Sequence, residues 1–109
     1  MKIMDILIKD AVILDLASKA KEGILDEMSQ ALAAADSSVS AERLLSVLIE
    51  REALQSTGIG EGVAIPHGKM AGLERLVASF ARSKEGVDFD SIDGQPTQLY
   101  FLLVVPEHS

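Results

Sequence analysis

The pattern of apolar and polar positions predicts two consecutive amphipathic helices in the first half of the chain. Over residues 19–35 the apolar side chains recur at helical spacing and share one face: Ile24, Leu25, Met28, Ala31, Leu32 and Ala35. Ser18 is the predicted N-cap of this helix. After a polar break, Ser40 is the predicted N-cap of a second helix over about residues 41–55. Its core stripe consists of Leu44, Leu45 and Leu48.

The remainder of the chain shows the shorter patterns that are typical of strands. Strands are predicted at residues 12–16, 63–65, 76–81, 87–90 and 97–105. Residues 87–90 alternate strictly, as in a half-buried strand, whereas 97–105 is apolar on both faces, as in a central strand covered on both sides. We also expect a short helix at 3–8, turns at 70–75 and Asp93–Gly94, and the end of the last strand at Pro106.

Two helices among several strands predict an α/β (α+β) fold, in which helices pack on a mixed β-sheet. The 109 residues suit a single domain over residues 1–109, and an apolar fraction of 48% is typical of a packed core. The sequence contains no internal repeat, low-complexity tract or linker.

The charge and the cysteine content exclude several classes of function. A net charge of −7 disfavours nucleic acid and anionic membrane surfaces as partners, although it suits a basic protein partner and also solubility. The absence of cysteine excludes disulfides and thiol chemistry and is compatible with the cytoplasm, where we expect the protein. No signal-peptide core is present, and the longest apolar run, Leu99–Val105, is too short for a membrane helix of about 20 residues.

The strongest candidate for chemistry is His67, which stands between Pro66 and Gly68. Pro66 fixes its own backbone and favours an extended Ile65, so the imidazole is presented at a rigid strand end before a flexible residue. A neutral imidazole is a good nucleophile for phosphoryl transfer and also a general base. The alternative interpretation is a partly exposed histidine with no role beyond its strand end.

The glycine-spaced loop at 56–62 precedes this strand. The hydroxyl groups of Ser56 and Thr57, together with glycine N–H groups, are suited to an anion nest lining the site. The loop is not a Walker loop, because no Gly-Lys-Ser/Thr sequence follows. An extended chain from Gly62 to His67 spans up to about 16 Å. The loop therefore reaches the histidine only if the chain bends back or Arg51 bridges the gap, and it could equally be a simple turn.

Two charged residues are further candidates for the same site. Arg51 could stabilise a phosphoryl group through a bidentate contact, or it could serve only as a cation at a helix C-terminus. Glu61 could orient the ring of His67, or it could repel a phosphate and make a phosphohistidine a better donor. No metal site is expected, because cysteine is absent and the one other histidine, His108, is expected in a frayed tail.

Several segments together resemble a known family. Arg51-Glu52 is followed, at 56–69, by Ser-Thr-Gly-Ile-Gly-x-Gly-Val-Ala-Ile-Pro-His-Gly-Lys. Residues 87–96 are Val-Asp-Phe-Asp-x-Ile-Asp-Gly-Gln-Pro, and residues 102–107 are Leu-Leu-Val-Val-Pro-Glu. These stretches resemble the IIA domains of the phosphoenolpyruvate-dependent phosphotransferase system, most of all the fructose/mannitol (type 2) class with its nitrogen-regulatory member.

The resemblance implies that His67 accepts a phosphoryl group from the phosphohistidine of HPr or its nitrogen-branch counterpart, with no cofactor. Arg51 falls on the family's active-site arginine. Glu61 falls on a position that is acidic in sugar-transport members and can be Asn in nitrogen-regulatory ones. Family domains continue through a further helix that brings a second histidine near the site. We therefore expect the 109 residues to be a C-terminally truncated domain that lacks the family's last helices.

Three functions remain open from the sequence. The favoured one is a nitrogen-regulatory phosphocarrier that binds or releases targets, such as potassium-transport proteins and sensor kinases, according to its phosphorylation state. The first alternative is a fructose-type transport component that passes the phosphoryl group to a IIB domain. The second is an adaptor that only binds.

Overall fold

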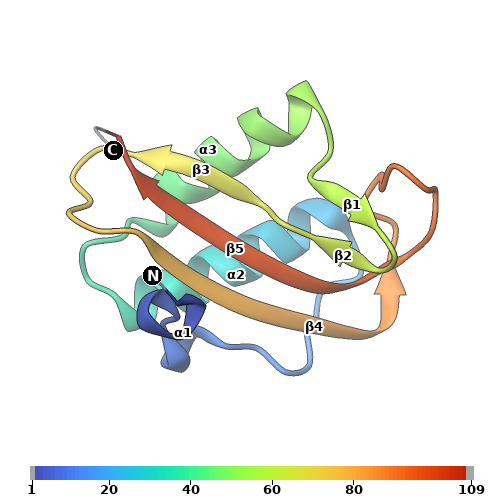
Figure 1. Cartoon of the computed structure of the whole chain (residues 1–109), viewed down its shortest axis with the longest axis horizontal. Coiled ribbons are helices and arrows are strands. Elements are labelled where there is room, and N and C mark those ends of the chain that lie inside the picture. Colours follow the sequence, from blue (N-terminus) through green and yellow to red (C-terminus); the bar gives the residue numbers. More distant parts are fainter. Residues whose placement is uncertain (1, 108–109) are drawn as a thin grey trace.

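The two long helices of the computed structural model, which describes residues 2–107, pack against each other and against one face of a sheet (Figure 1). Helix α2 spans Lys21–Ala35 and α3 spans Ala41–Leu54, so both predicted helices are confirmed to within two residues. Ser40 is the N-cap of α3, because its hydroxyl oxygen accepts a hydrogen bond from the Arg43 N–H at 3.3 Å.

The predicted N-cap of the first long helix is wrong. Helix α2 begins after Ala20, and the Ser18 hydroxyl instead bonds the Ala20 carbonyl at 3.3 Å, in a local turn that precedes the helix. The carboxylate of Glu27 accepts hydrogen bonds from the N–H groups of Ala17 and Ser18 at 2.9–3.1 Å. Ser18 is therefore held against the second turn of the helix and cannot cap its start.

The helices pack on a five-stranded mixed sheet. Its strands are β1 (Gly58–Gly60), β2 (Val63–Ala64), β3 (His67–Met70), β4 (Val77–Val87) and β5 (Thr97–Pro106). Strand β5 is central, because it pairs in parallel with β2 and β3 on one side and antiparallel with β4 on the other. Strand β1 pairs antiparallel with β2 at the edge. The mixed sheet flanked by helices predicted from the sequence is therefore confirmed.

Strands β2 and β3 are two parts of one line of chain beside β5. Val63 lies opposite Leu99 and His67 lies opposite Leu103, so the register is the same on both sides of the interruption. The interruption falls at Pro66, which has no N–H to donate to a ladder. Its carbonyl still accepts the Leu103 N–H at 2.9 Å, which keeps the two parts aligned. His67 is thus the first residue after a fixed break in the strand.

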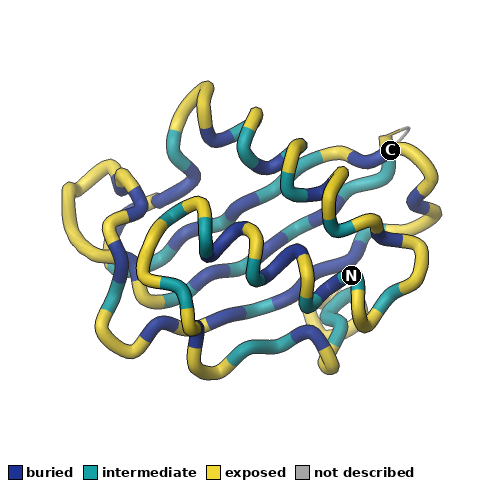
Figure 2. Tube along the Cα trace, turned by 180° about the vertical axis from the view of Figure 1, so that it is seen from behind, coloured by how far each residue is buried: buried dark blue, intermediate teal, exposed yellow. Residues whose placement is uncertain are grey.

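The two faces of β5 differ in burial. Tyr100, Leu102 and Val104 are fully buried in one apolar cluster with residues of α2 and α3. Figure 2 shows buried positions alternating with less buried ones along the strands of the sheet. The alternate side chains on the opposite face are only half-buried: Leu99, Phe101, Leu103 and Val105. The prediction of a central strand is confirmed, but within residues 2–107 the two-sided covering is wrong, because the two long helices lie on the same face.

The N-terminal segment also differs from its prediction. Helix α1 spans only Ile3–Ile6, and a 3-10 turn (η1) at Lys9–Ala11 precedes the predicted strand at 12–16. In that stretch Ile13 alone forms a ladder contact, an isolated parallel bridge with Ala81 of β4. The chain then bends at the exposed residues Leu14 and Asp15. The apolar run therefore lies along the edge of the sheet without forming a strand.

The predicted strand at 87–90 is wrong, although its burial pattern is right. Val87 is the last residue of the long strand β4, and Phe89 is buried between the exposed Asp88 and Asp90. Asp90 has a φ of 54°, which takes the backbone out of the extended region. The alternation thus reflects one buried aromatic side chain in a loop. The predicted turn at Asp93–Gly94 is confirmed by a hydrogen bond from the Gly94 N–H to the Ser91 carbonyl.

Candidate functional site

His67 lies at the start of β3, on the face of the sheet opposite α2 and α3. It pairs with Leu103, and paired residues of a parallel ladder share a face. Strand β3 lies at the edge of the sheet, so the ring is half-buried and remains accessible. Helix α3 runs beside this strand (Figure 1).

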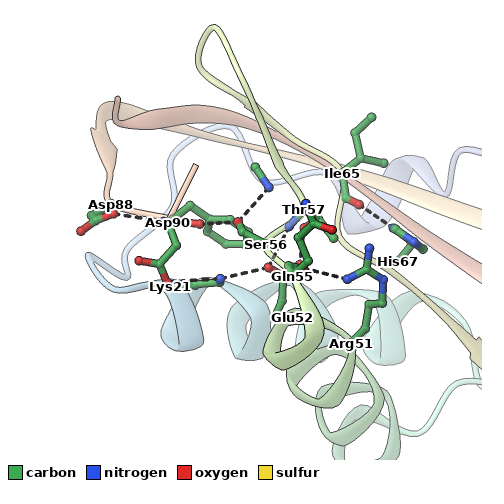
Figure 3. A network of polar contacts seen from close by, with 12 residues as sticks. Lys21, Arg51, Glu52, Gln55, Ser56, Thr57, Ile65, His67, Asp88 and Asp90 are labelled. Carbon is green, nitrogen blue, oxygen red and sulfur yellow. Dashed lines mark hydrogen bonds and ion pairs between the residues drawn. The ribbon is translucent and has the colours of Figure 1, made fainter. Parts of the chain in front are cut away.

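The orientation of the imidazole is fixed by its own backbone. The Nδ1 atom of His67 lies 2.8 Å from the carbonyl oxygen of Ile65 (Figure 3). A carbonyl oxygen can only accept a hydrogen bond, so Nδ1 carries the proton. In the neutral ring the lone pair is therefore on Nε2. The Ile65–Pro66 break in the strand thus leaves the lone pair of the neutral ring on Nε2.

An open cavity of about 470 Å³ adjoins the ring. It is lined by Val47, Glu50 and Arg51 of α3, His67, Gly68 and Lys69 of β3, and Val105 of β5. The structure thus brings together the two most important predicted site residues, Arg51 and His67, from elements that are separate in the sequence. Figure 3 shows the Arg51 side chain reaching from α3 toward the ring of His67.

Arg51 lies at the C-terminal end of α3, as one of its two interpretations has it, and it also lines the cavity beside His67. Its Nη1 donates a 2.7 Å hydrogen bond to the carbonyl of Gln55, just past the last turn of α3, where a cation is favourable. A guanidinium has five N–H donors, so this one bond leaves others for an anion in the cavity. The bond to Gln55 also restrains the side chain, which lowers the entropy lost when an anion binds.

Gly68 explains how α3 comes so close to β3. A Cβ atom at this position would lie 2.4 Å from Cγ1 of Val47, which is shorter than any ordinary contact. Glycine is therefore required by the close approach of the helix, not by a special backbone angle. Because Val47 lies one turn before Arg51, this contact sets the distance between the arginine and the strand that bears His67.

Ser56 and Thr57 do not line this cavity. The Ser56 hydroxyl donates to the carbonyl of Phe89 at 2.7 Å and accepts from the Gly58 N–H at 3.0 Å. The Thr57 hydroxyl and N–H both donate to the carboxylate of Glu52. The β1–β2 hairpin brings Thr57 back beside Ile65, whose N–H donates to the Thr57 carbonyl at 3.0 Å, but the hydroxyls of Ser56 and Thr57 bond elsewhere and do not line the cavity of His67.

The carboxylate of Glu52 organises a buried network on the other side of this loop (Figure 3). Its side chain is 6% exposed and forms an ion pair with Lys21 of α2 at 3.0 Å. The Lys21 amino group also lies 3.4 Å from Asp90 and 4.9 Å from the ring centroid of Phe89. The network joins α2, α3 and the loop at 88–90. No sequence spacing indicates it, because Lys21 and Glu52 lie far apart in the chain and on different helices.

Glu61 lies in the turn between β1 and β2 and does not line the cavity of His67. It is exposed with a φ of 57°, and its N–H donates to Asp93 Oδ2 at 2.9 Å. Asp93 also accepts the Gln95 N–H at 3.0 Å, and these two bonds hold the pKa of the Asp93 carboxyl below its usual value. Strand β2 and Pro66 separate Glu61 from the ring along the chain.

Neither a membrane helix nor a metal cluster is found in the described part of the chain. No helix within residues 2–107 has the length and apolar character needed to cross a membrane. Over the same residues, no three histidine, aspartate or glutamate side chains gather closely enough to hold a metal ion. His108 lies outside the described residues.

Comparison with known proteins decides the family. The sequence profile described as "Phosphoenolpyruvate-dependent sugar phosphotransferase system, EIIA 2" matches residues 5–109. The chain belongs to this EIIA 2 family. Its EIIA fold is also similar to the crystal structure of the nitrogen regulatory protein IIA-Ntr from Neisseria meningitidis, with 40% identity and a TM-score of 0.86 over 94% of this chain and 70% of that one.

This EIIA chain is similar both to a sugar-specific transport component and to a nitrogen regulatory protein. It is 42% identical over 107 residues to the fructose-specific EIIABC component of Bacillus subtilis, covering 98% of this chain but 17% of that protein. It is 41% identical over 107 residues to a nitrogen regulatory protein of Bradyrhizobium diazoefficiens, covering 98% of this chain and 69% of that protein. The EIIA chain thus spans about a sixth of one relative and about two thirds of the other.

Proposed function

We propose that this EIIA domain accepts a phosphoryl group on Nε2 of His67 from the phosphohistidine of HPr or a nitrogen-branch HPr-like carrier. The observation that carries the proposal is the 2.8 Å contact of Nδ1 with the Ile65 carbonyl, which leaves the Nε2 lone pair available beside an open cavity. The domain would act as a phosphotransferase component through a transient phosphohistidine.

The proposed step exchanges one nitrogen–phosphorus bond for another. The Nε2 lone pair attacks the phosphorus atom of the carrier's phosphohistidine, and the new bond forms as the old one breaks. The electron pair of the broken bond returns to the imidazole of the carrier, which leaves as a neutral ring with a proton on its other nitrogen. Nδ1 of His67 keeps its proton, because the Ile65 carbonyl holds it. The step therefore needs no base, water or cofactor.

Arg51 is the proposed partner of the transferred group. Phosphoryl transfer depends mainly on positioning and on neutralising charge at the phosphoryl oxygens. The guanidinium lines the cavity beside His67 and is restrained by Gln55. The carboxylate of Glu50 lines the same cavity and adds a negative charge to its wall. We do not assign Ser56, Thr57 or Glu61 to the phosphoryl group, because their contacts lie elsewhere.

We favour a nitrogen-regulatory role in the cytoplasm. The similarity to the IIA-Ntr structure and the 69% coverage of the Bradyrhizobium protein support a regulatory phosphocarrier with target proteins as recipients. The 42% identity to the fructose-specific component supports the second candidate, a transport component that passes phosphate to a IIB domain. A single buried apolar cluster joins the helices and the sheet, which supports treating residues 1–109 as one domain.

Donor choice and onward transfer separate these candidates. The domain should be incubated with phosphoenolpyruvate, the first enzyme of the system and either HPr or the nitrogen-branch carrier, and its intact mass measured. A regulator should gain one phosphoryl group faster from the nitrogen-branch carrier and pass it slowly, or not at all, to a fructose-type IIB domain. Fast transfer to IIB would support the transport candidate. A domain that gains no phosphate from either carrier would be a binding adaptor.

A further inference from the structure

We propose that Lys69 is a second cation that contacts the phosphoryl group on His67, an inference that rests on the function proposed above. Lys69 lines the same cavity as His67 and Arg51. The family resemblance implies a role for Arg51, whereas that of Lys69 follows from the geometry of β3.

The register of β3 directs Lys69 to the side of the sheet on which His67 lies. The two residues pair with Leu103 and Val105, whose side chains share the half-buried face of β5. Residues two apart in a strand lie about 6.6 Å apart on one face. The four-carbon stem of a lysine spans such a distance, so its amino group can reach oxygens attached through Nε2 of the ring.

Lys69 has no competing ion pair in the described part of the chain. Its side chain is exposed, and no carboxylate of residues 2–107 lies within 4.0 Å of its amino group, whereas Lys19 and Lys21 both form such pairs. Glu50 lines the cavity that Lys69 shares with His67, and Glu107 lines an adjoining cavity of about 330 Å³ that Lys69 also borders. Both carboxylates are beyond ion-pair distance.

The charge of the product favours a second cation beside Arg51. A phosphoryl group carries a charge of about −2 near neutral pH. One donor of Arg51 is already used by the Gln55 carbonyl, and Glu50 adds a negative charge to the cavity wall. An exposed ammonium that can swing between two cavities can pair with the phosphoryl oxygens after transfer. It is not held there before transfer.

The test is the equilibrium constant for phosphoryl exchange between the carrier and the domain. HPr, or the nitrogen-branch carrier if that is the one that phosphorylates the wild type, is mixed with wild type, Lys69→Met, Lys69→Arg or Lys84→Met. Lys84 is the matched control, an exposed lysine on the distant strand β4. The equilibrium constant compares separated proteins, so a lysine that only helped the carrier dock would change the rate and not this constant.

We expect Lys69→Met to shift the equilibrium about fivefold toward the carrier, the upper range for an exposed ion pair. Lys69→Arg and Lys84→Met should stay within about twofold of wild type, and the Lys69→Met effect should shrink at high salt. Equal constants for Lys69→Met and Lys84→Met, or an equal loss in Lys69→Arg, would overturn the role of Lys69 while leaving His67 as the acceptor. A wild type that takes phosphate from neither carrier would overturn both proposals.

Discussion

The carbonyl of Ile65 holds Nδ1 of His67 at 2.8 Å, and this contact determines which ring nitrogen can react. We predict that phosphorylation gives exclusively the Nε2-phosphorylated ring, because Nδ1 stays protonated and bonded to the backbone. Nitrogen-15 and phosphorus NMR of the phosphorylated domain, labelled at histidine, distinguishes the two isomers. Phosphate on Nδ1 would show that the ring rotates away from the Ile65 carbonyl before it reacts. It would contradict the proposal that Ile65 orients the ring.

The contact between Gly68 and Val47 offers a test of how α3 is placed. Gly68→Ala should destabilise the domain by about 1–3 kcal/mol, because the new methyl group would overlap Cγ1 of Val47. Val47→Ala should remove the overlap, so the double variant should be more stable than the sum of the two single effects predicts. Urea unfolding of the four proteins measures this coupling. Simple additivity would mean that the helix moves freely away from the strand.

Periodic segments of the sequence were sufficient to predict the main elements of the fold. Helices α2 and α3 and the central strand β5 each have a long apolar pattern with a clear period, so their positions were predicted closely. Strands β1 and β3 are short and rich in glycine, and they become strands only because distant partners bond them. Local patterns cannot show a pairing of that kind.

Part of the candidate site could likewise be predicted from local sequence, and part depends on contacts between distant segments. The local sequence was enough to predict His67 at a strand end, but spacing alone left two roles open for Arg51. Only the packing of α3 on β3 brings the two residues together. The hydroxyls of Ser56 and Thr57 were suited to an anion nest by residue type. They turn instead toward Phe89 and toward the buried carboxylate of Glu52, whose pairing with a distant lysine no local pattern reveals.

The Glu52 network should contribute to stability independently of phosphoryl transfer. Glu52→Gln removes the negative charge that pairs with Lys21, so we expect a loss of about 1–3 kcal/mol. Glu50→Gln is the matched control on the same helix; this exposed side chain forms no ion pair within residues 2–107, so its effect should stay within about 0.5 kcal/mol. Equal unfolding free energies for the two variants would exclude a stabilising role for the buried pair.

The buried phenol of Tyr100 should make the domain less stable at alkaline pH. Burial raises the pKa of its phenol from 10.0 to about 12, and the hydroxyl donates to the Thr97 carbonyl at 2.7 Å. A raised folded-state pKa means that the neutral form stabilises the fold below pH 10, and that this contribution is lost as the pH rises from 10 toward 12. Tyr100→Phe should be less stable by about 1 kcal/mol at neutral pH, from the lost hydrogen bond.

The difference in unfolding free energy between wild type and Tyr100→Phe should therefore become smaller above pH 10. Thermal unfolding of both proteins as a function of pH measures this difference. The chain has a single tyrosine, so tyrosinate absorbance reports this group alone. A phenol that ionises in the folded protein near pH 10, or a stability difference that stays constant with pH, would contradict the assignment.

The central claim is that His67 alone receives the phosphoryl group, and His108 provides the matched control because it is the only other histidine. Wild type, His67→Gln and His108→Gln are incubated with phosphoenolpyruvate, the first enzyme of the system and the carrier, and their intact masses are recorded before and after brief acid treatment. We predict one acid-labile phosphoryl group on wild type and on His108→Gln, and none on His67→Gln. An acid-labile phosphoryl group that persists in His67→Gln would contradict the account.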